Sequence, residues 1–140
     1  KMKARRAHAV PLSKQVRGYL TDLAEMLGRE GYVFPSARSS KRPMSENTLN
    51  AAFRRMGYSK EEVTAHGLRA TASTFLNESG LWNPDAIERA LAHGDSNVVR
   101  GIYHRGKHWD ERVRMAQWWS DYLDELRTGG KVIMGKFAKG

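Results

Sequence analysis

Apolar residues recur every three or four positions over five stretches of the chain, a spacing that predicts a mostly helical domain. The clearest stretch begins after Ser13, which can cap a helix, and closes near Gly28. Its predicted apolar face consists of Val16, Leu20, Leu23 and Leu27. The longest predicted helix covers about residues 110–127, with an apolar stripe of Met115, Trp119, Tyr122 and Leu126.

Three shorter helices are expected between these two. Ser45 can cap the first, which Gly57 closes. The next covers about residues 66–77, and Gly80 follows it. The last begins at Asn83-Pro84, a capping residue followed by a proline in the first helical turn.

The start of the chain departs from the helical pattern. Residues 1–6 form a basic turn, and residues 7–12 have the character of a short strand, so together they resemble half a hairpin. Residues 32–35 form a short apolar run that we expect to be buried, and a polar, basic loop follows at 36–43. A second candidate strand covers 131–134. The expected fold is therefore mainly α with a small N-terminal β element.

Composition narrows the function. The chain has 140 residues, enough for one ordinary domain, and no cysteine, which excludes disulfides and thiolate metal sites and suits a reducing cytoplasm. Its net charge of +9 favours a polyanionic partner, nucleic acid ahead of an acidic membrane surface. The sequence contains no apolar run long enough to span a bilayer and no secretory signal.

Four residues stand out chemically. His66 and Arg69 are three positions apart, so on a helix both can reach the same anion. His93 is expected at a helix C-terminus, which favours its imidazolium form. Tyr103 follows ten residues later, and nearby cations would favour ionisation of its phenol. Taken singly, each residue is more often structural than catalytic.

Together these residues resemble the signature of tyrosine recombinases: histidine, two residues, arginine; then leucine-x-histidine; then a tyrosine about ten residues on. The segment from His66 to Thr74 resembles the integrase box. The residues from Tyr103 to Arg105, and the later run from Met115 to Leu123, resemble the end of P4-like prophage and genomic-island integrases. The resemblance covers most of residues 3–133 and is specific to the C-terminal catalytic domain.

The resemblance implies a role for each site residue. Tyr103 would attack a DNA phosphate and form a 3′-phosphotyrosyl link, while Arg69, His66 and His93 stabilise the charge on the phosphate oxygens. Lys3, eight residues before Pro11, would protonate the leaving oxygen, with Lys1 as the weaker alternative. Neither a nucleotide cofactor nor a metal is implied. Further basic residues are expected to contact the DNA backbone: Arg5, Arg6, Lys41, Arg42, Arg100 and Arg105.

The resemblance also implies partners and domains. The partner would be double-stranded DNA at attachment sites, bound by a tetrameric assembly together with accessory DNA-bending or directionality proteins, in the bacterial cytoplasm at the nucleoid. Residues 1–140 would be a catalytic domain truncated at its N-terminus, because the family's first catalytic arginine and its other DNA-binding domains precede residue 1. Residues 129–140 would form a flexible or exchangeable tail. Trp109 stands where relatives often carry a second tyrosine.

Other readings remain open. A type IB topoisomerase uses similar chemistry, and a DNA-binding fragment without cleavage activity would share the charge. His104, His108 and Glu111 have a spacing that could hold zinc. Gly106 argues against a regular helix there, and no acidic general base separates the histidines, so we do not favour a metal site.

Overall fold

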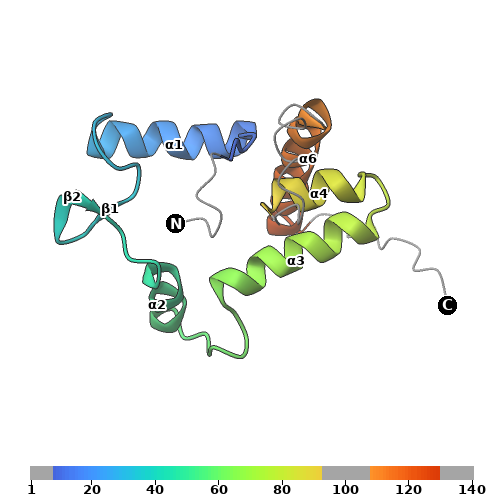
Figure 1. Cartoon of the computed structure of the whole chain (residues 1–140). Coiled ribbons are helices and arrows are strands. Elements are labelled where there is room, and N and C mark those ends of the chain that lie inside the picture. Colours follow the sequence, from blue (N-terminus) through green and yellow to red (C-terminus); the bar gives the residue numbers. More distant parts are fainter. Residues whose placement is uncertain (1–7, 93–107, 130–140) are drawn as a thin grey trace, which may run out of the picture. The chain divides into compact units, whose positions relative to one another are not determined.

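The computed structural model describes residues 8–92 and 108–129 and divides the chain into two compact units, residues 16–71 and residues 1–15 with 72–140. The described residues form helices and one small sheet, so the mainly α fold is confirmed (Figure 1). In chain order, the elements are α1 (Lys14–Leu27), β1 (Pro35–Ser36), β2 (Ser39–Pro43), α2 (Thr48–Arg55), α3 (Ala65–Glu78), α4 (Pro84–Ala90) and α6 (Trp109–Arg127).

The two helices of the unit 16–71 end as the sequence predicts. Gly28 and Gly57 take φ values of +86° and +96°, a region that glycine adopts without strain, and so terminate α1 and α2. The predicted start of α2 is wrong by two residues. Ser45 accepts a backbone hydrogen bond from Thr48, so it opens a turn, and Asn47 occupies the N-cap position instead.

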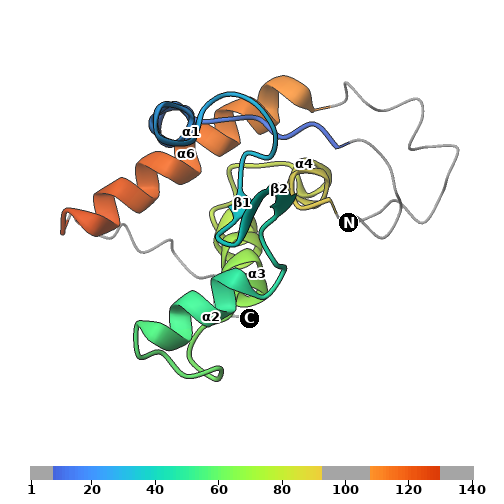
Figure 2. The ribbon, with the colours of Figure 1, turned by 90° about the vertical axis from the view of Figure 1, so that its left-hand side faces the viewer.

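The sheet lies in this unit and not at the N-terminus of the chain. β1 and β2 pair antiparallel, with Pro35 opposite Pro43 and Ser36 opposite Ser39, so the predicted basic loop is largely a hairpin. Figure 2 shows the two strands above α2. The expected burial of residues 32–35 is wrong for most of that run: Tyr32, Val33 and Phe34 are more than half exposed, because so short a strand pair covers no apolar face.

The expected N-terminal strand is also wrong within the described residues. Residues 8–13 have no regular secondary structure, and residues 1–7 lie outside the described part. A strand needs a hydrogen-bonded neighbour, and no described strand pairs with this segment. The carbonyl of Ala9 instead accepts a hydrogen bond from the guanidinium of Arg112.

The hydrophobic core of the other unit forms where α4 packs against α6. Ile87 and Met115 are 0% and 2% exposed, and Leu76 of α3 completes the cluster. Asn83 caps α4 by accepting a hydrogen bond from the backbone N–H of Asp85, with Pro84 in the first turn, as the sequence predicts. Trp118 and Trp119 of α6 pack around this core. None of the helices within 8–92 and 108–129 is both long and apolar enough to cross a bilayer.

Candidate active site

The first turn of α3 carries two of the predicted site residues. His66 is exposed and Arg69 is half-buried, three positions apart on the helix. Within the described part of the chain, neither side chain makes a hydrogen bond or an ion pair. A half-buried guanidinium without an acidic partner is available for an anion, and the imidazole three positions before it on the same helix face can add a further donor.

Local contacts define where this helix begins. The hydroxyl of Thr64 accepts a hydrogen bond of 2.9 Å from the backbone N–H of Gly67, which satisfies one of the unpaired donors of the first turn. A Cβ at Gly67 would lie 3.1 Å from that same hydroxyl oxygen, so glycine gives the hydroxyl room to approach. The cap sets the start of α3, directly before His66.

The loop ahead of α3 has a structure of its own. The backbone N–H of Ser59 donates to Oε2 of Glu62 at 2.7 Å, and the N–H of Glu62 donates back to the Ser59 hydroxyl at 3.3 Å, a reciprocal capping box. The hydrogen bond from the backbone N–H of Ser59 first, and then the Ser59 side-chain hydroxyl, lower the pKa of the Glu62 carboxyl below its ordinary value. The loop is therefore held at its centre by its own side chains.

Two residues of α2 that the sequence analysis missed hold this loop from outside. Arg54 donates through Nη1 to the carbonyl of Tyr58 at 2.7 Å and through Nη2 to the carbonyl of Val63. Oδ1 of Asn50 accepts a hydrogen bond of 2.9 Å from the backbone N–H of Ala65. No local sequence pattern predicts the contacts with Val63 and Ala65, because they join residues nine and fifteen positions apart.

Lys41 and Arg42, predicted to contact the DNA backbone, lie in β2 and are exposed. Neither side chain has an acidic partner among the residues that the structure describes. Successive side chains of a strand point to opposite faces, so Lys41 and Arg42 would have to contact different phosphates of a duplex.

The remaining predicted site residues lie outside the described residues: Lys1, Lys3, Arg5, Arg6, His93, Arg100, Tyr103 and Arg105. Their flanks are described. α4 ends at Ala90, and Ala92 has a φ of 51°, so the expected continuation of this helix to His93 is wrong. A left-handed residue cannot continue a right-handed helix, and this one precedes His93 directly.

On the other side of the undescribed segment, α6 begins six residues after Tyr103, next to a polar cluster. Oε1 of Glu111 accepts a hydrogen bond of 2.7 Å from the backbone N–H of Asn83, and Oε2 lies 2.9 Å from Nδ1 of His108. The Asn83 bond first, and then the His108 bond, lower the pKa of Glu111. Two members of the rejected zinc triad thus meet as a hydrogen-bonded pair, while His104 lies outside the described residues.

A buried arginine fixes the N-terminal segment to α6. Arg112 is 5% exposed, and its Nη2 donates to the carbonyl of Ala9 at 2.5 Å. Its Nε has no hydrogen-bond partner within the described residues, and its guanidinium carbon lies 5.5 Å from the ring centroid of Trp109. Burial, and then the charge of Arg89, lower the pKa of Arg112. Nε2 of His8 lies 3.4 Å from the carbonyl of Ala90, so this segment also reaches the end of α4.

Tyr122, a tyrosine on α6, has a packing role. Its ring stacks on Trp118 with centroids 5.5 Å apart and planes at 8°, and it also contacts Trp119 and Phe75. This tyrosine belongs to an aromatic cluster beside the core, a setting that accounts for it without a chemical role.

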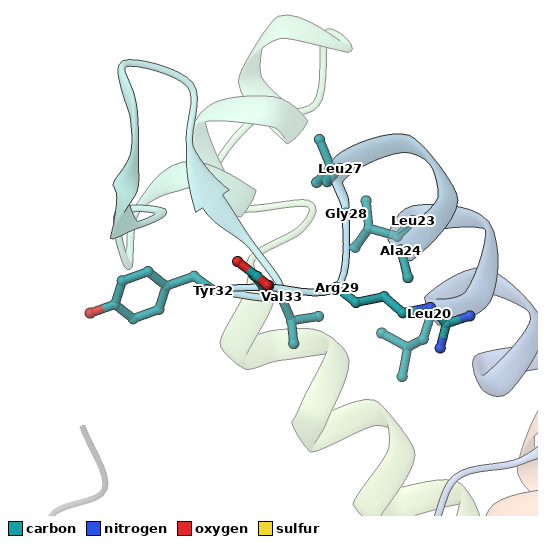
Figure 3. A pocket seen from close by; sticks show the side chains of 10 residues that line it. Leu20, Leu23, Ala24, Leu27, Gly28, Arg29, Tyr32 and Val33 are labelled. Atoms are coloured by element: carbon teal, nitrogen blue, oxygen red, sulfur yellow. The ribbon is translucent and has the colours of Figure 1, made fainter.

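A pocket of about 280 Å³ lies between the C-terminal half of α1 and residues 28–33. Figure 3 shows Leu20, Leu23 and Val33 around it. None of the candidate site residues that the structure describes lines it, so we do not assign it to the site.

Comparisons with known proteins agree with the resemblance. The chain is 49% identical to the integrase of Enterobacteria phage P4 over 91% of its own length and 29% of that protein. It is 41% identical to the prophage integrase IntA of Escherichia coli K12 over 95% of its length and 32% of that protein. It is also 41% identical to the integrase of Shigella phage Sf6, over 89% of its length and 32% of that protein.

The chain spans about a third of the length of these relatives. No solved structure matches it. Residues 1–108 match the phage integrase family. Because this match covers 108 of 140 residues, the chain belongs to the phage integrase family.

Proposed function

We propose that the chain is the DNA-breaking and rejoining domain of a site-specific recombinase that integrates and excises a prophage or genomic island. The observation that carries the proposal is the pair His66 and Arg69 on the first turn of α3, both without a partner in the described residues. Such a pair can grip a phosphodiester without a metal. Membership of the phage integrase family supports DNA as the molecule that carries this phosphodiester.

The proposed reaction begins at Tyr103. Its phenol oxygen attacks the scissile phosphorus as the phenol proton passes to solvent. A P–O bond to Tyr103 forms at the 3′ phosphate, and the bond from phosphorus to the 5′ oxygen breaks. Lys3 protonates the departing oxygen, which leaves a 5′-hydroxyl. A 5′-hydroxyl from a second site reverses these steps and joins the new strand, so the phosphodiester bond energy is conserved in the protein–DNA link.

Arg69, His66 and His93 stabilise the charge that develops on the non-bridging oxygens. By family resemblance, an arginine before residue 1 completes this set. Arg5, Arg6, Arg100 and Arg105, with Lys41 and Arg42, contact phosphates along the duplex. The protein acts as a tetramer on attachment-site DNA with accessory DNA-bending or directionality proteins, and residues 129–140 dock on their own domain or on a neighbour.

A two-site plasmid assay separates this proposal from its alternatives. The complete gene product that contains this chain is incubated with a plasmid carrying two attachment sites. A recombinase gives recombined circles whose formation depends on both sites. A type IB topoisomerase relaxes supercoils on a plasmid without sites and gives no recombined product. A DNA-binding protein without cleavage activity shifts the DNA but yields neither product.

A further inference from the structure

The start of α3 is held by side chains of α2. Arg54 bridges the carbonyls of Tyr58 and Val63 with its two Nη atoms. The planar guanidinium fixes both acceptors in one plane, so this side chain closes the loop over residues 58–63. Because both of its Nη atoms donate to protein carbonyls, we assign this arginine to the protein's own backbone and not to DNA.

Asn50 adds the direct link to the site. It lies one helical turn before Arg54, on the same face of α2, and accepts the backbone N–H of Ala65 at 2.9 Å. Ala65 is the first residue of α3 and immediately precedes His66. The two α2 side chains therefore contact the backbone at both ends of the loop and at the first residue of the helix.

The position of this turn matters for phosphate chemistry. Donors that stabilise a transition state act only when they are aligned before the reaction, and a misplacement of about 1 Å can cost on the order of 100-fold in rate. His66 and Arg69 sit on the turn that Asn50 and Arg54 hold. The capping box of Ser59 and Glu62 and the Thr64 cap are separate contacts, so the loop and the helix keep local support without Arg54.

We propose that Asn50 and Arg54 are positioning residues, which hold the first turn of α3 so that His66 and Arg69 meet the same phosphate. The inference rests on the proposed function. It assigns to α2 a role in transition-state stabilisation without contact with DNA. The matched control is Arg55, the next residue of α2, which is exposed and has no described partner.

The test compares two substrates in the complete gene product. One is a nicked attachment site with an ordinary scissile phosphate. In the other, a methyl group replaces one non-bridging oxygen of that phosphate, so the group is neutral. The neutral group develops one less negative charge in the transition state, and therefore depends much less on charge-stabilising donors. The measured quantity is the rate of covalent protein–DNA adduct formation.

We expect Arg54→Met and Asn50→Ala each to slow adduct formation about 10- to 100-fold on the ordinary phosphate and less than about threefold on the neutral one. Arg69→Met should show the same pattern with a larger loss. Arg54→Met should cost less in the Arg69→Met background than in the native protein, because part of its effect passes through Arg69 and only the placement of His66 remains to be lost. Arg55→Met should match the native protein on both substrates.

Equal losses on both substrates for Arg54→Met and Asn50→Ala would overturn the inference, because they would indicate a general loss of structure. Unchanged rates on the ordinary phosphate would also overturn it. If Arg54→Met fails to fold, Asn50→Ala, which removes a single acceptor, decides the question. The quantity is again its loss in rate on the ordinary phosphate compared with its loss on the neutral one. Failure of the proposed function is recognised separately, since the native protein would then form no adduct on either substrate.

Discussion

The hydroxyl of Thr64 accepts a hydrogen bond from the backbone N–H of Gly67, and a Cβ on Gly67 would come within 3.1 Å of the hydroxyl oxygen. The cap that starts α3 therefore depends on glycine at its third position. This relationship links the stability of the helix to the placement of His66.

Gly67→Ala is expected to disturb this cap. Glycine-to-alanine changes inside helices normally stabilise by about 0.5–1 kcal/mol, and Gly18→Ala in α1, where a Cβ meets nothing within 4 Å, should show that gain. The free energy of unfolding of Gly67→Ala should be about 1 kcal/mol lower than that of Gly18→Ala, the value of an N-cap hydrogen bond. Urea unfolding of the two variants checks the difference, and equal gains would show that the cap adjusts freely.

Arg112→Met should change the free energy of unfolding by less than about 1 kcal/mol. The guanidinium is buried with Nε unpaired in the described residues, so its desolvation cost offsets much of what its bond to Ala9 contributes. Methionine fills a similar volume without that cost. Met115→Ala, at a residue in the same helix that is 2% exposed, is the contrast and should lose about 2–5 kcal/mol. A loss of that size for Arg112→Met would mean that the hydrogen bond from Arg112 to Ala9 stabilises the fold by much more than the desolvation of the guanidinium costs.

Part of this fold follows from local sequence signals. Asn83 and Pro84 predict the start of α4, and Gly28 and Gly57 predict the ends of α1 and α2. These signals are local, because each residue acts on the backbone next to it. The placement of the sheet could not be predicted in this way. The apolar residues 7–12 have strand character, but whether they form a strand depends on a partner elsewhere in the chain, and Arg112 binds the carbonyl of Ala9 instead.

The site shows the same division. His66 and Arg69 were predicted to share the start of one helix, and α3 places them there. Asn50, Arg54 and Arg112 were missed, since each contacts a backbone group that tertiary structure brings to it. Polar residues that bind a distant backbone leave no spacing pattern in the sequence.

The stability of α6 against α4 should depend on pH through Glu111. The N–H of Asn83 and the ring of His108 lower the pKa of this carboxyl in the folded protein. The stabilisation is therefore complete above the unfolded pKa near 4.5 and is lost as the pH falls through the lower folded pKa. Glu111→Gln should be less stable than the native protein at about pH 7, and the deficit should shrink at about pH 3. Glu125→Gln, at an exposed residue of the same helix, is the control. A deficit independent of pH would contradict this explanation.

Binding to duplex DNA should weaken with salt, and Lys41 and Arg42 should contribute to that dependence. Replacing either residue by glutamine is expected to reduce the slope of log binding constant against log salt by about 1 if its side chain neutralises a phosphate. Lys60→Gln is the control, because Lys60 already lies 3.7 Å from Glu61. Affinity titrations at several salt concentrations measure the slopes. An unchanged slope for both strand variants would remove β2 from the interface.

The most direct test of the proposed function is to identify the residue that becomes linked to DNA. The complete gene product is incubated with a nicked attachment site, the trapped adduct is digested, and mass spectrometry locates the modified peptide. We predict that the modification is on Tyr103. Tyr103→Phe should abolish the adduct and leave DNA affinity within about twofold, since only a hydroxyl is lost, and Tyr122→Phe should still form the adduct because that ring packs in the aromatic cluster. An adduct on any other residue, or an undiminished adduct in Tyr103→Phe, would contradict the account.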